Sequence, residues 1–124
     1  MNAVDSLQAA FDNASFATLP ARPVVADSGW QTTPDRRQSV RLLAYAGADG
    51  EPSSIRFRAR GEPLLVALAN ELCRELSAQS ADSWPAVAEL VWPFNVPNDS
   101  VALLFALQDA VDALMASAVT HQED

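Results

Sequence analysis

The chain has 124 residues with one Cys, one His, no Lys and a formal net charge of −8. A single thiol, Cys73, excludes an internal disulfide, a Cys-rich zinc site and an iron–sulfur cluster held by this chain alone, and the lack of Lys excludes Schiff-base and P-loop chemistry. The length fits one domain, residues 1–124, and the acidic charge opposes binding to nucleic acid or to an anionic membrane, because both need a cationic surface.

The N-terminal part is predicted to hold one short helix followed by a long loop. Residues 4–12 place Leu7 and Phe11 on one side at the spacing of an α-helix. Across residues 13–38, Pro and Gly recur and interrupt any longer period, with Trp30 among the few apolar anchors. We therefore expect this segment to be rich in loops.

The two strands of a hairpin are predicted next. Residues 39–45 and 54–60 have the composition of strands, and Asp49-Gly50 lies between them. An Asp-Gly pair is a strong hairpin signal, because both residues tolerate the positive φ angles of a tight turn. In the second strand apolar and Arg side chains alternate strictly, which places one set inward and three guanidinium groups outward.

A helix is predicted from Pro63, since Pro is favoured in a first helical turn, where its missing N–H costs nothing. Its buried face is formed by Leu side chains at helical spacing. These are Leu64, Leu65, Leu68, Leu72 and Leu76. Cys73 lies beside them at the same spacing, so we interpret it as a small buried apolar residue rather than a reactive thiol.

Two further helices are predicted near the C-terminus. Ser83 as a cap and a Pro at the first position favour a helix over residues 85–91. The last helix starts at residues 98–100, any of which can cap it, and runs to about Val119. Its apolar stripe consists of Leu103, Leu104, Leu107, Val111, Leu114 and Met115.

The order of these elements keeps the strands apart from the helices. A helix and a long loop come first, and a hairpin and three helices follow. Such an order predicts an α+β domain in which a small antiparallel sheet of two to three strands has its helices packed on one face.

Charge is unevenly distributed, because seven of the eight Arg lie between Arg36 and Arg74. One interpretation is that this basic part and the acidic C-terminal part neutralise each other across the fold. The other is that outward arginines form a docking face for an acidic partner. These arginines are Arg41, Arg56, Arg58 and Arg60. We expect no aromatic side chains among them, which argues against stacking of single-stranded nucleic acid.

No targeting or membrane segment is expected. The start of the chain lacks the positive region and the apolar stretch of a signal peptide. No apolar run approaches the roughly 20 residues that a membrane helix needs. We therefore expect a cytoplasmic protein.

Several local strings occur in an order and spacing typical of a known family. Phe11-Asp12-Asn13 closes the first predicted helix, and Arg56-Phe57 leads through Gly61-Glu62 into a small and apolar helix over residues 65–76. Asn98-Asp99-Ser100-Val101 then opens an Ala-rich last helix. In this arrangement the chain resembles the U-type iron–sulfur cluster assembly scaffold family, the NifU N-terminal or IscU-like domain. The resemblance implies a fold of that type over most of the chain.

The same resemblance places the family's ligand positions at residues that are not thiolates. The Cys positions fall at Arg36, Glu62 and Asp99, with Asn98 at the His position and Gln38 at the position of a family Asp. Iron–sulfur clusters are held by soft thiolates. The resemblance therefore implies a divergent member that does not hold a cluster in the family manner, and we expect no metal and no cofactor.

Three uses of these positions are open. Arg36 can form an ion-pair cluster with Glu62 and Asp99, because a guanidinium can fill a vacated cation site. Each residue can instead have an ordinary role, with Asp99 as a helix cap, Glu62 as a favourable charge at a helix N-terminus and Arg36 as a solvated loop residue. Finally, the oxygens of Glu62, Asp99 and Asn98 suit a hard cation such as Mg²⁺.

The sequence thus predicts a scaffold-like protein of iron–sulfur cluster assembly that acts as a binding or regulatory module and not as an enzyme, since Glu62 and Asp99 form the only plausible acid–base pair. The family's partners imply a cysteine desulfurase or another assembly protein as partner. Trp92 and Phe94 fall at the family's chaperone-recognition string, where they are either exposed partner anchors or plugs at the end of the sheet. A small interaction domain unrelated to iron is the alternative.

Overall fold

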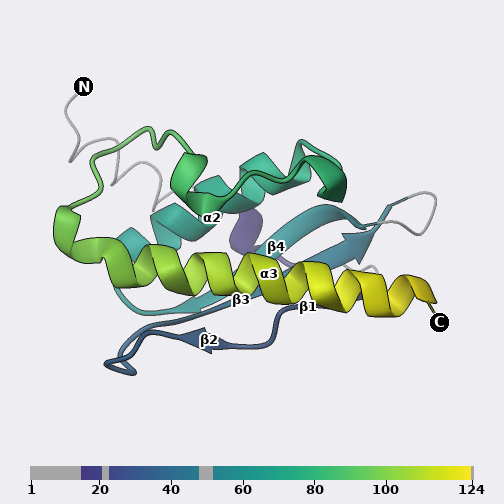
Figure 1. Cartoon of the computed structure of the whole chain (residues 1–124), viewed down its shortest axis with the longest axis horizontal. Coiled ribbons are helices and arrows are strands. Elements are labelled where there is room, and N and C mark those ends of the chain that lie inside the picture. Colours follow the sequence, from purple (N-terminus) through teal and green to yellow (C-terminus); the bar gives the residue numbers. More distant parts are fainter. Residues whose placement is uncertain (1–14, 21–22, 48–51, 124) are drawn as a thin grey trace.

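The computed structural model describes residues 15–20, 23–47 and 52–123 (Figure 1). Its strands are β1 (Val24–Asp27), β2 (Gln31–Thr32), β3 (Ser39–Ala46) and β4 (Pro52–Arg60), and its α-helices are α2 (Pro63–Ser77) and α3 (Val101–Glu123). Single turns of 3₁₀ helix are η1 (Ser15–Ala17), η2 (Ala81–Ser83), η3 (Val87–Glu89) and η4 (Asn98–Ser100). The predicted α+β class is confirmed, and the helix predicted over residues 4–12 lies outside the described residues.

β3 is the central strand of an antiparallel sheet. β4 pairs with one of its edges, and β1 and β2 share the other edge. The predicted hairpin is therefore confirmed, with Ser39 opposite Arg60 at its open end. The expected number of two to three strands is wrong, because the described part of the chain contains four.

The segment predicted to be rich in loops, residues 13–38, contains both β1 and β2. They lie along the same edge of β3 and are separated by a break at Ser28-Gly29. The Ser28 Oγ accepts from the Leu42 N–H at 2.9 Å, and the Ser28 N–H donates to the Leu42 carbonyl at 3.0 Å, so Ser28 bridges the break. Gly29 has a φ of 68°, which side chains other than Gly disfavour. The Pro and Gly that indicate loops thus bound short strands here, because pairing with β3 outweighs local propensity.

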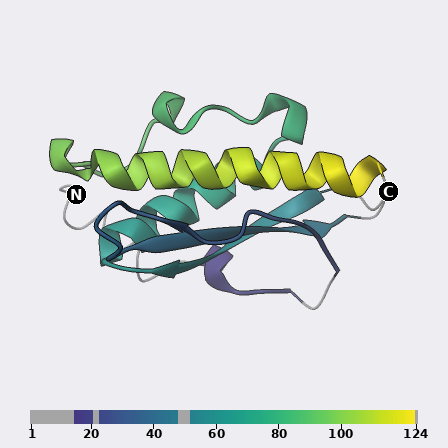
Figure 2. The ribbon, with the colours of Figure 1, turned by 60° about the horizontal axis from the view of Figure 1, so that its bottom comes forward.

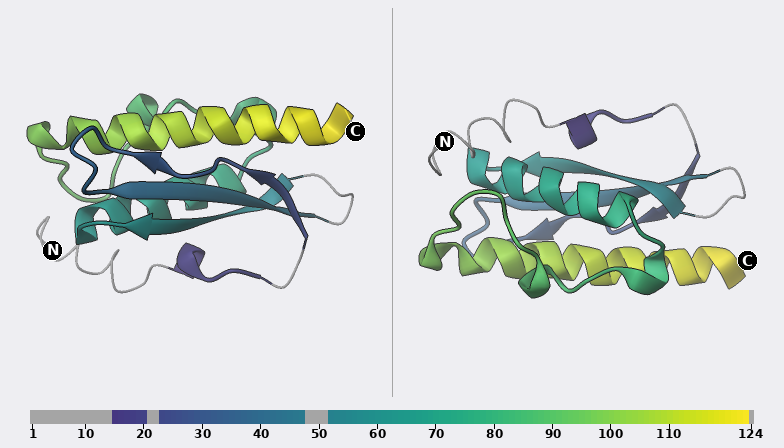
Figure 3. Two further views of the ribbon diagram at one scale, coloured as in Figure 1. Left: turned by 90° about the horizontal axis from the view of Figure 1, so that it is seen from below. Right: turned by 90° about the horizontal axis from the view of Figure 1, so that it is seen from above.

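Both α-helices cover the same face of the sheet, as predicted (Figure 2). α2 lies over β4, and α3 lies over β1, β2 and β3. The connection between the helices, residues 78–100, runs along their side away from the sheet. No α-helix of the described residues covers the opposite face, and η1 lies beside β4 on that side (Figure 3).

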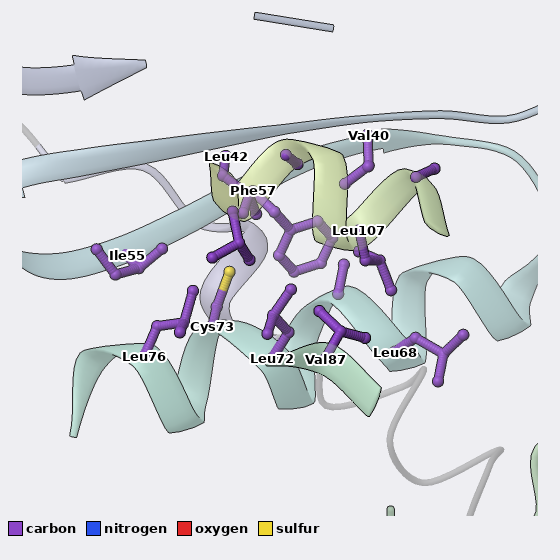
Figure 4. Close-up of a cluster of buried hydrophobic side chains, with 14 of the residues drawn as sticks. Val40, Leu42, Ile55, Phe57, Leu68, Leu72, Cys73, Leu76, Val87 and Leu107 are labelled. Carbon is purple, nitrogen blue, oxygen red and sulfur yellow. The ribbon is translucent and has the colours of Figure 1, made fainter. Parts of the chain in front are cut away.

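A hydrophobic core fills the space between the sheet and the two helices (Figure 4). Burying each of its large side chains stabilises the fold by roughly 1.5–3 kcal/mol. Cys73 lies among them without exposed surface, as predicted. The largest fully buried side chains are Phe57, Leu42, Ile55, Leu65, Leu68, Leu72, Leu76, Leu107, Leu114, Val40, Val87 and Val111.

The helix predicted over residues 85–91 is wrong, because only the single turn η3 forms there. Hydrogen bonds to both long helices hold this segment instead. The Val87 N–H donates to the Gln108 Oε1 of α3 at 2.7 Å, and the Trp84 Nε1–H donates to the Leu76 carbonyl of α2 at 2.9 Å. A helix of about two turns is only marginally stable by itself. The hydrogen bonds to α2 and α3 stabilise the observed conformation of this segment instead.

α3 begins at Val101 rather than at residues 98–100, which form η4. Leu104 of the predicted stripe is half-buried, and Met115 is 39% exposed, so the prediction for Met115 is wrong. Ala side chains take part in its buried face, where the helix packs closely against the sheet. The buried residues of α3 are Leu103, Ala106, Leu107, Ala110, Val111 and Leu114.

The stretch Asn98–Ser117 is long and apolar enough to cross a membrane, by length and composition alone. This corrects the expectation that no apolar run approaches that length. The helix packs on β1 and β3, and burial of one side accounts for an apolar composition without a membrane.

Gly61, between β4 and α2, leaves no room for a larger residue. A Cβ there would lie 2.7 Å from the Gln38 Oε1 and 3.0 Å from the Leu65 Cδ2. We predict that Gly61→Ala lowers the free energy of unfolding, measured in urea, by about 1–3 kcal/mol, because a φ of 157° is strained for a side chain and the Gln38 side chain must also move. Adding Gln38→Ala should restore part of the loss, and a double variant as unstable as Gly61→Ala would contradict this explanation.

Candidate functional site

A hollow of about 210 Å³ lies where the turn between β2 and β3, the start of α2 and the start of α3 meet, at the left end of Figure 1. We call it the carboxylate pocket. Its lining residues are Thr33, Asp35, Gln38, Glu62, Asp99, Ser100, Ala102 and Leu103. Glu62 and Asp99 therefore come together as predicted, and Gln38 lies with them, whereas Arg36 and Asn98 are not part of the lining.

The predicted ion-pair cluster around Arg36 does not form. Arg36 is exposed in the turn between β2 and β3, with a φ of 62°. No ion pair of the described residues includes it, so its predicted role as a solvated loop residue fits the structure. The two ion pairs among the described residues are Arg41–Asp27 and Arg74–Glu71.

Asp35 organises this turn and takes the place in the pocket that was predicted for Arg36. It accepts hydrogen bonds from the Thr33 hydroxyl and, at 3.0 Å, from the Arg37 N–H. These bonds, the one from Thr33 first, hold the pKa of Asp35 below its usual range. The signal was present in the sequence, because Thr and Asp side chains commonly bond to nearby turn residues.

Glu62 and Asp99 reach the pocket from helix starts. Glu62 stands at the N-cap of α2, where its N–H donates to the Gln38 Oε1 at 3.2 Å and its carboxylate lies near the positive end of the helix. Asp99 lies within η4, whose capping position is Pro97, so its predicted role as a helix cap is wrong. In the described part of the chain, no three Cys, His, Asp or Glu side chains lie close enough together to hold a metal ion.

Cys73 does not line the carboxylate pocket. Its thiol is fully buried in the core, pointing between α2 and the sheet among apolar side chains (Figure 4). Burial raises the pKa of the Cys73 thiol far above its usual range. A thiol that stays protonated and covered is neither a nucleophile nor a metal ligand.

The second candidate site is the outward face of the sheet, opposite the helices. Its basic side chains are Arg41 on β3 and Arg56, Arg58 and Arg60 on β4, and we call this surface the arginine face. The register places Arg41 directly opposite Arg58. Directly opposite side chains in an antiparallel pair have Cβ atoms about 4.5–5.5 Å apart, so two like charges are neighbours here.

Arg41 has an acidic partner, whereas Arg58 has none among the described residues. Asp27 on β1 accepts from the Arg41 Nε at 2.9 Å and also from its Nη2. The Arg41 hydrogen bonds hold the pKa of Asp27 below its usual range. Arg58 is exposed and belongs to neither of the two ion pairs. Its charge is therefore available to solvent or to a partner.

The two other arginines lie against aromatic rings. The Arg60 guanidinium stands 4.5 Å from the centre of the Trp30 ring, and that of Arg56 stands 5.1 Å from the centre of the Phe16 ring. Arg56 also donates to the Thr18 carbonyl at 3.2 Å. The expectation that aromatic side chains are absent from this face is wrong, because both rings come from segments distant in the sequence from β4.

The predicted anchors Trp92 and Phe94 lie on the helix side of the molecule. Phe94 is buried in the core, and Trp92 is half-buried against it, with 6.2 Å between the two ring centres. The predictions were exposed partner anchors or plugs at the end of the sheet, and the burial of Phe94 excludes the first use for that residue. Among the predicted contact residues, Arg58 and Arg60 of β4 are the ones that the structure leaves exposed.

Comparisons with known proteins add no family to this description. Neither a scan against protein-family models nor a search of curated proteins finds a match. The resemblance to the iron–sulfur scaffold family thus stays a prediction.

The Asp27–Arg41 pair makes stability depend on pH in a defined direction. Because the pKa of Asp27 is lower in the folded protein, its contribution is present above the unfolded value of about 3.9 and is lost as the pH falls through the folded value. We predict that Asp27→Asn lowers the free energy of unfolding by about 1 kcal/mol near neutral pH. The effect is small because both side chains of the pair are one-third exposed and solvent screens their charges.

Urea unfolding of both proteins across the acid range measures this effect. The difference between wild type and variant should shrink as the pH falls below about 4. Asp109→Asn, which changes an exposed carboxylate on α3, is the control and should have little effect. A difference between Asp27→Asn and wild type that is independent of pH would contradict the role of this ion pair.

Proposed function

We propose that this protein is a non-catalytic protein-binding module that binds an acidic partner through its arginine face. The observation that supports this most is the Arg41–Arg58 pair on a sheet face without a covering α-helix in the described residues. Like charges directly opposite each other destabilise a sheet. Asp27 offsets the charge of Arg41, and an acidic partner would offset that of Arg58. Complementary charge also speeds association and excludes wrong partners.

The alternative, that the basic and acidic parts neutralise each other inside the fold, has no support from the ion pairs. In the described residues these join Arg41 to Asp27 and Arg74 to Glu71. Neither acid belongs to the acidic C-terminal part, which begins at Glu75. On the arginine face, Arg58 and Arg60 therefore keep exposed charges outside the ion pairs of the described residues.

The relation to iron–sulfur cluster assembly is part of the proposal. The pocket at the predicted ligand positions holds carboxylates and an amide, and the one thiol of the chain is buried elsewhere in the core. These groups fit a protein that does not hold a cluster itself. The resemblance to the scaffold family suggests a cysteine desulfurase or another assembly protein as the acidic partner.

The absence of a cluster can be tested by anaerobic incubation of the purified protein with iron and sulfide. We expect no stable cluster absorbance, because a single buried thiol cannot replace several accessible thiolates. A thiol reagent should label Cys73 only after unfolding. A cluster that forms on the wild type and is lost in Cys73→Ala would contradict the proposal.

The binding surface can be tested by reversing its charge. We expect the double variant Arg58→Glu and Arg60→Glu to bind a purified cysteine desulfurase at least about tenfold more weakly, with the wild-type affinity falling as salt is added. Arg74→Glu is the matched control, because Arg74 is exposed on α2 and outside the arginine face.

A polyglutamate peptide serves as a second probe in the same titration. Binding of polyglutamate without binding of the desulfurase would favour an interaction domain unrelated to iron. If Arg74→Glu weakens binding as much as the double variant, or if neither probe binds the wild type, the arginine face is not the binding surface.

A further inference from the structure

The outer edge of β4 presents backbone groups that the sheet does not use. The N–H and carbonyl of Leu42 on β3 bond to Ser28, on the β1 side. In an antiparallel pair the backbone groups of successive residues point to alternate sides. Phe57, the partner of Leu42, therefore points its own N–H and carbonyl away from β3, toward the outer edge. By the same alternation, Ile55 and Ala59 do so as well.

One of these three positions is already closed. The Ile55 N–H donates to the Ser77 Oγ at 2.9 Å, and the Ser77 hydroxyl donates to the Ile55 carbonyl at 3.4 Å, so α2 caps the edge there. This contact also supports the assignment of the alternation, because it reaches Ile55 from outside the sheet. For Phe57 and Ala59, the described residues provide no such partner.

A groove lies along this open part of the edge. It has a volume of about 240 Å³ and is lined by Ala17, Phe57, Arg58, Ala59 and Val66. Ala17 belongs to η1 and Val66 to α2. The Phe16 N–H of η1 donates to the Asn70 Oδ1 of α2 at 2.9 Å, so η1 bounds the groove and leaves the part of β4 at Phe57 to Ala59 to line it. Unpaired backbone groups in a groove are the features that strand addition uses.

We propose that this groove binds an extended segment of an acidic partner protein, which adds to the sheet as a strand beside β4. The segment's backbone bonds to the N–H and carbonyl groups of Phe57 and Ala59. Its side chains alternate, with small apolar residues beside Val66 and carboxylates beside Arg58 and Arg60 on the arginine face. This inference rests on the proposed function, because it describes how the acidic partner is held.

The positive charges of β4 indicate which kind of segment the groove binds. A strand that pairs with β4 brings every second side chain next to its arginines, where opposite charges stabilise and like charges destabilise. A second copy of this chain, paired through its own β4, would place Arg beside Arg and is disfavoured. An acidic segment satisfies the same positions. Because Ser77 closes the edge at Ile55, the pairing is short and the expected affinity is modest.

The test uses short synthetic peptides that alternate Glu and Val, titrated against the full chain by calorimetry. Backbone N-methylation on every second residue removes the amide donors on one side of the peptide only. We expect one methylated series to bind at least about tenfold more weakly and the other to bind like the parent peptide, since only one side of a strand faces β4. A peptide with Lys in place of Glu should not bind.

A protein variant tests the same contact from the other side. Ala59→Pro removes the outward N–H of Ala59 without removing a hydrogen bond to β3, and Pro is tolerated on edge strands in this position. Ala59→Val keeps the N–H and is the matched control. We expect the Pro variant to lose peptide binding and the Val variant to keep it, with circular dichroism verifying the fold of both. If the Pro variant does not fold, the binding of the N-methylated peptides to the wild type still tests strand addition.

The outcomes separate this inference from the proposed function. Equal binding of both N-methylated series, with loss of binding in the variant carrying Arg58→Glu and Arg60→Glu, would overturn strand addition and leave charge-based binding at the arginine face. Failure of the parent peptide to bind would overturn strand addition, while the desulfurase and polyglutamate titrations decide on the arginine face separately. Equal binding of the Lys peptide would overturn the acidic character of the partner.

Discussion

Strict alternation along β4 is the constraint on which the core, the arginine face and the edge groove all depend. One set of its side chains, which includes Ile55 and Phe57, packs beneath α2, and the other set consists of arginines on the opposite face. The same alternation determines which backbone groups reach the outer edge. Shifting the register by one residue would bury Arg58 and expose Phe57, so the energy of core packing holds the proposed binding surfaces in place.

The end of the sheet where the resemblance places a metal site is a small polar pocket. Gln38 joins its two sides, because its side chain bonds to the N–H of Glu62 at the start of α2. Gly61 makes that contact possible by leaving no Cβ between them. Contacts of the turn and of the helix start thus account for the pocket, and the proposed binding charges lie on β4 instead.

The sequence predicted the elements with the strongest periodicity and missed those held by contacts from elsewhere. The hairpin and the leucine face of α2 are correct, since periods of two and of 3.6 residues are direct consequences of strand and helix geometry. β1 and β2 were missed because they are too short to show a period and exist through pairing with β3. At the candidate site, Glu62 and Asp99 line one pocket as expected. Asp35, which accepts from the Thr33 hydroxyl, lines it as well, whereas Arg36 does not.

The sequence by itself determined the α+β class, the buried state of Cys73 and the poverty of soft metal ligands, because composition and local period express these properties directly. Only the tertiary structure decided that Arg60 lies over Trp30, that Arg41 pairs with Asp27 and stands opposite Arg58, and that Phe94 is buried. These contacts join residues far apart in the chain, and their formation depends on the register of the sheet and the packing of the helices. No local pattern contains that information, so only the folded chain shows the shape of the proposed binding surface.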